Sequence, residues 1–293
     1  FLYLNKSGFK ASYITDRFQG LGIIALLSVL FAIWFSQNSI SDLIAYSQLG
    51  GINSFETFSF KSALAVVVAV TAAEVFSQGY WQRTFSAENT KSIKSASVYA
   101  GLGCFTTVLL LGIAGAVGAG KGIENPTLSF IQQLELSTPM SFLLLVLCTL
   151  LVASSVDTLE NAISSTISLD LVKKGAIEAR FITVGIVVFS ILCSVYVSNI
   201  FNVFLVADLF AVCLVFPTFY KLKNKSTGSY LLIPFLISLT SAYSYRFIFI
   251  DMEINPGGVF IPTDLYGLAD LNTFLVGLVS SILVTVAYNK ITK

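Results

Sequence analysis

Eight long apolar runs constrain what this chain can fold into. Each run has roughly 20 residues, and a helix rising about 1.5 Å per residue then crosses a hydrocarbon core ~30 Å thick. The runs lie at Thr15–Phe35, Ser62–Trp81, Val98–Gly118, Met140–Ile163, Phe181–Val197, Val203–Tyr220, Tyr230–Phe249 and Leu271–Tyr288. Because backbone N–H and C=O groups find no partner in lipid, each run is expected to be helical.

The composition excludes the soluble classes. Of 293 residues, 55% are hydrophobic and only 11% are charged, and the mean hydropathy is +0.83. A soluble protein would need amphipathic surface helices and many more charges, so we predict an all-α polytopic membrane protein in contact with lipid. The four cysteines stand singly and histidine is absent, which leaves no zinc-binding spacing. Nothing in the net charge of +1 indicates a nucleic-acid partner.

The basic residues are distributed unevenly between the two sides of the predicted membrane. When the loops are assigned alternately, 14 of the 17 Lys and Arg residues fall on one side, and only Lys61, Lys121 and Arg246 on the other. The positive-inside rule then predicts a multi-pass protein of the plasma membrane, the bacterial inner membrane, with both ends of the chain in the cytoplasm. The chain begins without Met, so we interpret residues 1–293 as one transmembrane domain cut from a longer protein.

One predicted helix, LVASSVDTLENAISSTISLDLV from Leu151 to Val172, is unusually polar. Ser154, Thr158, Asn161 and Ser165 follow at helical spacing, with Asp157 on an adjacent stripe. Such a sector faces other helices or a cavity rather than lipid. Hydroxyl, carbonyl and carboxylate oxygens are the ligands that a small hard cation prefers. The alternative is that these hydroxyls bond back to carbonyls or join helices together.

Several ionisable residues lie within the apolar runs, where each costs at least ~2.5 kcal/mol. They are Asp16, Glu74, Asp157, Glu160 and Asp208. Such residues are functional candidates by default. Asp16 has an alternative role as a hydrated acid at a helix start, where the helix dipole favours it.

The second apolar run carries polar residues where it should stay apolar, in VFSQGYWQR. Gly79 permits a break in this helix, and a broken helix at membrane depth is tolerated where it lines a cavity. Freed backbone groups with Glu74, Gln78 and Tyr80 are then candidates to bind a polar solute, and Glu74 favours an amine, amide or polyol. The alternative is an interfacial helix end with Tyr80 and Trp81 in an aromatic belt. No phosphate loop or nucleophile–base pair appears, so we predict a carrier rather than an enzyme.

Three motifs resemble those of the sodium:solute symporter family, the relatives of the sodium/glucose and sodium/proline cotransporters. They are Ser154-Ser155 followed by Asn161, Ser165 and Ser168-Leu169-Asp170; QRTFSAEN at 82–89; and GFKASYITDRFQG at 8–20. They occur in family order. The resemblance implies a partial LeuT-type fold of about eight transmembrane helices, similar to core helices five to twelve, with the N-terminal helices missing.

The resemblance also implies a sodium site. Its ligands are the hydroxyls of Ser154 and Ser155 and the carbonyl of Leu151. A second sodium position matches Asp157, Thr158 and Asp16. The chain departs from the family pattern at Asp157 and Glu160, where uncharged residues are usual, and this leaves proton coupling open.

We therefore expect a sodium-coupled secondary symporter that imports a small polar solute by alternating access. The solute belongs to the urea, amino acid, polyol or sugar class, and its expected contacts are Glu74, Gln78, Tyr80 and Asn161. One alternative is a proton-coupled carrier that uses Asp157. Another is a symporter-like sensor domain of a signalling protein.

Overall fold

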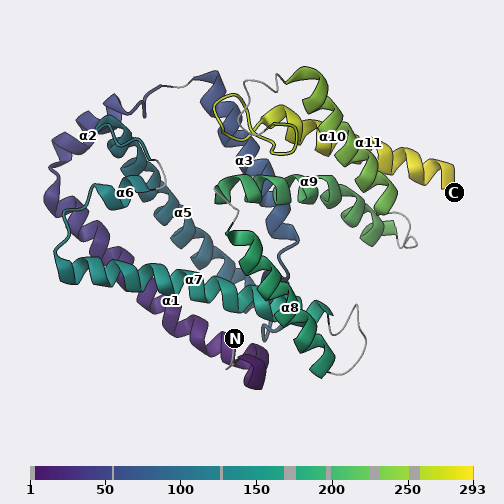
Figure 1. Cartoon of the computed structure of the whole chain (residues 1–293), viewed down its shortest axis with the longest axis horizontal. Coiled ribbons are helices and arrows are strands. Elements are labelled where there is room, and N and C mark those ends of the chain that lie inside the picture. Colours follow the sequence, from purple (N-terminus) through teal and green to yellow (C-terminus); the bar gives the residue numbers. More distant parts are fainter. Residues whose placement is uncertain are drawn as a thin grey trace. The chain divides into compact units, whose positions relative to one another are not determined.

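The computed structural model describes residues 4–54, 56–125, 128–167, 176–195, 199–224, 231–250 and 258–292. In these ranges the regular elements are all helices, apart from an isolated β-bridge between Thr263 and Ala269 (Figure 1). The helices are α1 (Leu4–Gln37), α2 (Ile40–Leu49), α3 (Thr57–Val75), α4 (Gln78–Phe85), α5 (Thr90–Gly120), α6 (Ser129–Gln132), α7 (Thr138–Thr166), α8 (Ala176–Ser194), α9 (Ile200–Asn224), α10 (Leu232–Phe249) and α11 (Leu271–Thr292). The prediction of an all-α protein is confirmed.

Seven helices in the described part of the chain are long and apolar enough to cross a membrane. They coincide with seven of the eight predicted segments: Ile14–Gln37, Thr57–Val75, Thr90–Gly120, Thr138–Glu160, Ile200–Lys223, Leu232–Phe249 and Leu271–Ile291. The eighth, Phe181–Val197, lies largely in α8, a 19-residue helix that is not among the seven. The polytopic class is confirmed, and the count of eight stays a prediction.

The second predicted run is interrupted, although not at Gly79. The N–H groups of Phe76 and Ser77 bond to the carbonyls of Ala73 and Glu74 at 2.9 and 3.1 Å. These i→i+3 bonds tighten the last turn and end α3 at Val75, before α4 begins at Gln78. The predicted break is confirmed, whereas a continuous span as far as Trp81 was wrong.

The described chain divides into two compact units. The first comprises Phe1–Ser54 and Gln78–Phe189, and the second comprises Phe55–Ser77 and Ser190–Lys293. The sequence therefore passes from the second unit back to the first at the break between α3 and α4. We describe each unit by itself.

In the first unit α1 and α7 pack along each other, and α5 packs against α2 and α6 (Figure 1). Trp34 on α1 is 1% exposed, and its indole N–H donates to Oε1 of Gln133 at 3.1 Å. The crossing of α2 and α5 requires glycine. A Cβ on Gly120 would lie 1.9 Å from the carbonyl oxygen of Tyr46.

In the second unit α9 packs against α3, α10 and α11. The small side chains of Ala65, Ala69 and Ala72 on α3 let that helix approach Leu205 and Leu209 on α9. This packing brings Glu74, near the end of α3, onto the helix pair that also carries Asp208.

Candidate functional site

Polar residues from three helices of the first unit converge in a group that we call the Asp16 cluster: Asp16, Arg83, Ser154 and Thr158. Asp16 on α1 faces α7, where Ser154 Oγ donates to its Oδ1 at 3.4 Å. The Asp16 side chain is only 17% exposed. The structure thus brings together three of the predicted sodium ligands, because α1 and α7 pack along each other.

Arg83 on α4 supplies the positive charge of the Asp16 cluster. Its Nη2 forms an ion pair with Asp16 Oδ2 and donates to Thr158 Oγ1 at 2.9 Å. Its Nη1 donates to the carbonyl oxygen of Gly79 at 3.2 Å. A guanidinium therefore stands where the resemblance expected a second cation, and it balances the charge of Asp16.

Gly79 allows α4 to approach α7 closely enough for these contacts. A Cβ at this position would lie 2.5 Å from Cγ2 of Thr158. The glycine singled out in the sequence therefore serves the close packing of α4 against α7 rather than the helix break. A second link between the two helices joins the Gln82 amide to the Ser165 hydroxyl.

The hydroxyls of α7 bond in part to their own helix, as the alternative interpretation proposed. Ser155 Oγ donates to the carbonyl of Leu151 at 3.1 Å, and Thr158 Oγ1 donates to that of Ser154 at 3.0 Å. A hydroxyl that donates its proton keeps two lone pairs on oxygen, and a carbonyl that accepts one bond keeps capacity for another. Back-bonding thus leaves these oxygens able to bind a cation.

Of the remaining predicted residues at the end of α7, the structure describes the side chain of Glu160. The side chains of Asp157 and Asn161 lie outside the described residues, and so do Ser168, Leu169 and Asp170. Glu160 is 8% exposed and has interaction partners within the protein. Its burial agrees with an interior role for this part of the helix.

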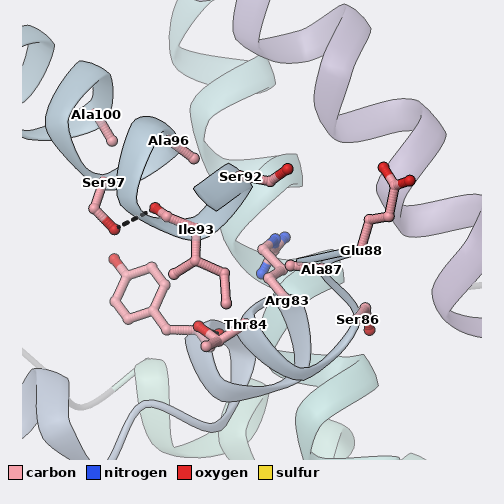
Figure 2. Close-up of a pocket in the computed structure, with 11 residues that line it drawn as sticks. Arg83, Thr84, Ser86, Ala87, Glu88, Ser92, Ile93, Ala96, Ser97 and Ala100 are labelled. Carbon is pink, nitrogen blue, oxygen red and sulfur yellow. Dashed lines mark hydrogen bonds between the residues drawn. The ribbon is translucent and has the colours of Figure 1, made fainter. Parts of the chain in front are cut away.

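A cavity of about 740 Å³ opens between α4 and the first turns of α5 (Figure 2). Its lining combines the charges of Arg83 and Glu88 with several hydroxyl groups and a small apolar surface. The residues are Tyr80, Arg83, Thr84, Ser86, Ala87, Glu88, Ser92, Ile93, Ala96, Ser97 and Ala100. Tyr80, a predicted solute contact, is among them, whereas Gln78 is not. Since Arg83 belongs to both, the cavity reaches the Asp16 cluster.

The second unit holds another of the predicted solute contacts, Glu74. Asp208 on α9 is 6% exposed, whereas Glu74, near the end of α3, is exposed. Two acids carried by one apolar helix pair form an anionic locus that favours a cation or a bound proton. Asp208 was noted in the sequence but was not assigned to the site.

Arg246 on α10 is fully buried and has a structural role. Its guanidinium donates to the carbonyls of Gly258, Val259 and Thr263 at 2.6, 2.9 and 3.0 Å. It also lies 3.9 Å from Asp270. The arginine therefore holds the segment 258–270, before α11, in place.

Sequence reasoning did not assign Arg83 to the site. It was counted only as a loop charge and as part of the QRTFSAEN motif. The available signal was the glycine four residues before it, which places the arginine one turn further along the same helix. No sequence pattern pairs Arg83 with Asp16, which is 67 residues away.

These features define an all-helical, polytopic membrane protein with a partly buried polar cluster between α1, α4 and α7. The chain is similar to the spermidine transporter DUR31 of Candida albicans, with 28% identity over 234 residues. The match covers 76% of this chain and 44% of that protein, so the chain spans less than half the length of this relative. No family model matches the sequence, and no solved structure matches it.

Proposed function

We propose that this chain belongs to a sodium-coupled secondary transporter for a small polar solute, of the sodium:solute symporter type with a LeuT-like fold. The observation that carries the proposal is the contact between Ser154 and Asp16, which joins the hydroxyl-rich segment of α7 to α1. The similarity to a transporter and the break between α3 and α4 support it.

The proposed sodium ligands are the Leu151 carbonyl and the Ser154 and Ser155 hydroxyls. These neutral oxygens suit a monovalent cation, because they carry no negative charge that would balance a divalent one. We propose no sodium ion at the second position, at Asp16, Asp157 and Thr158, since Arg83 already supplies a cation to Asp16 and Thr158. One sodium ion is therefore the stoichiometry we propose.

Among the small polar solutes, we propose that the transported solute is an amine. Buried Asp208 and exposed Glu74 supply negative charge on the apolar helices of the second unit, where an ammonium group would be favoured. The relative is named for spermidine, which carries several ammonium groups. We also propose that Tyr80 and Glu88, which line the cavity beside α4, contact the solute on its path.

Coupling requires only that sodium and solute stabilise the same conformation. Each needs a differential affinity of about 1–3 kcal/mol between the two conformations, and linkage then makes the effect reciprocal. We propose that sodium bound to the oxygens of α7 stabilises the packing of α7 against α1. We propose that the solute leaves on the cytoplasmic side, which the positive-inside asymmetry of the sequence favours.

Uptake into vesicles tests this proposal. The full-length protein is reconstituted, an inward sodium gradient is imposed, and accumulation of radiolabelled spermidine is measured. We expect sodium-driven accumulation that Ser154→Ala plus Ser155→Ala abolishes. Ser141→Ala plus Thr149→Ala is the matched control, because these α7 hydroxyls also bond back to their own helix.

Two results would contradict the proposal. The first is equal uptake in sodium and in choline, and the second is uptake indifferent to the loss of Ser154 and Ser155 hydroxyls. Accumulation driven by a pH gradient without sodium would instead support the proton-coupled alternative.

A further inference from the structure

Gln19 on α1 carries an unpaired buried oxygen. Among the described side chains, its Oε1 is the buried polar atom without a hydrogen-bond partner. Buried polar atoms are nearly always paired, because leaving one unsatisfied after its removal from water destabilises the fold. An unpaired carbonyl-type oxygen keeps its capacity to bind a group outside the described residues.

The position of Gln19 on α1 shows what it faces. One turn earlier, Asp16 contacts Ser154 on α7. One turn later, a Cβ on Gly22 would lie 3.4 Å from Cδ1 of Leu150 on α7. Residues three apart share a helix face, so Gln19 lies between these two contacts and faces α7 between Leu150 and Ser154.

We propose that Gln19 Oε1 is a further ligand of the sodium site on α7. The inference rests on the proposed sodium coupling and adds to it a ligand from α1. The facing segment contains Leu151, whose carbonyl is a proposed ligand and accepts from Ser155 Oγ, and it ends at Ser154, which contacts Asp16 on α1. With Gln19 the set comprises four neutral oxygens from two helices.

The neutral character of Gln19 fits its surroundings. Asp16 is one turn away, but its charge is balanced by Arg83. A carboxamide oxygen adds a strong dipole without adding charge, which favours a monovalent over a divalent cation. A ligand on α1 also gives sodium a direct means to hold α1 against α7.

Thermal unfolding of the full-length protein in detergent tests this inference without measuring transport. The melting temperature is recorded against increasing sodium chloride, with choline chloride keeping the ionic strength constant. Gln19→Leu removes the oxygen at similar volume, and Gln19→Glu retains an oxygen. Gln48→Leu is the matched control, because Gln48 lies on the exposed surface of α2.

We expect sodium to raise the melting temperature of the wild-type protein. Gln19→Leu should need an about tenfold higher sodium concentration for half of this effect, the loss typical of one ligand to a charged group. Its melting temperature in choline should fall little, since Oε1 has no hydrogen bond to lose. Gln19→Glu and Gln48→Leu should respond to sodium at concentrations near that of the wild type.

The possible failures are distinguishable. If sodium stabilises the wild type and Gln19→Leu equally, the inference is wrong and the proposed function stands, and Oε1 then faces a water molecule or another part of the protein. If the wild type melts at the same temperature in sodium and in choline, both are wrong. A large loss of stability of Gln19→Leu in choline would also overturn the inference, because it would show a structural partner.

Discussion

The ion pair between Arg83 and Asp16 provides the sharpest test of how α4 is held against α1 and α7. We consider Arg83→Met, which removes the charge but keeps most of the apolar stem, and Asp16→Asn, which is nearly isosteric. Each single substitution leaves one partly buried charge without its partner. The double substitution removes both charges and leaves no unpaired ion.

The expected size follows from the burial of the pair. The Arg83 side chain is 34% exposed and that of Asp16 is 17% exposed. The pair therefore lies between a surface ion pair, worth ~0–1 kcal/mol, and a buried ion pair, whose breakage costs ~3–5 kcal/mol. Discounting for solvent screening, we expect each single variant to lose ~2 kcal/mol of unfolding free energy. The double variant should lose only ~2–3 kcal/mol, which corresponds to a coupling energy of ~1–2 kcal/mol.

Equilibrium unfolding of the full-length protein in mixed micelles measures these free energies, provided that the denaturant slope is unchanged among the variants. Arg17→Met on the exposed part of α1 is the control and should change stability by less than ~0.5 kcal/mol. If the two single effects simply add to within ~0.5 kcal/mol, Arg83 and Asp16 do not stabilise one another and the cluster is wrongly described.

Three further predictions concern packing, the buried arginine and the solute. Gly120→Ala should destabilise the protein by ~2 kcal/mol or more in thermal unfolding, because its Cβ would overlap α2, whereas Gly112→Ala meets nothing within 4 Å and should be neutral. Arg246→Met should cost ~3 kcal/mol and expose the segment before α11 to limited proteolysis, and an unchanged cleavage pattern would contradict its role. Asp208→Asn should raise the KM for spermidine uptake about tenfold, and an unchanged KM would exclude this acid from amine binding.

The fold class could be predicted because membrane crossing imposes a simple requirement on length and hydrophobicity. The boundaries of the apolar runs and of the helices agree within a few residues at most ends, for example Leu271–Tyr288 against α11. The end of α3 could not be placed in this way. Two i→i+3 bonds at Phe76 and Ser77 decide it, and hydropathy does not encode backbone geometry.

The candidate site was predictable only in part. Ser154 and Thr158 stood out by helical spacing, and Asp16 by its charge and by family resemblance. The register between α1 and α7 determines that Asp16 meets Ser154 and that Gln19 has no partner, and a single sequence does not contain that register. Arg83 escaped assignment because a basic residue near the end of an apolar run has the same pattern as an ordinary cytoplasmic anchor.

Direct binding of radioactive sodium to the purified full-length protein tests the central claim most directly. We predict saturable sodium binding by the wild type and by the double variant Ser141→Ala plus Thr149→Ala. The double variant Ser154→Ala plus Ser155→Ala should bind about tenfold less sodium. Equal binding by all three proteins, or no saturable binding by the wild type, would contradict the assignment of a sodium site to α7.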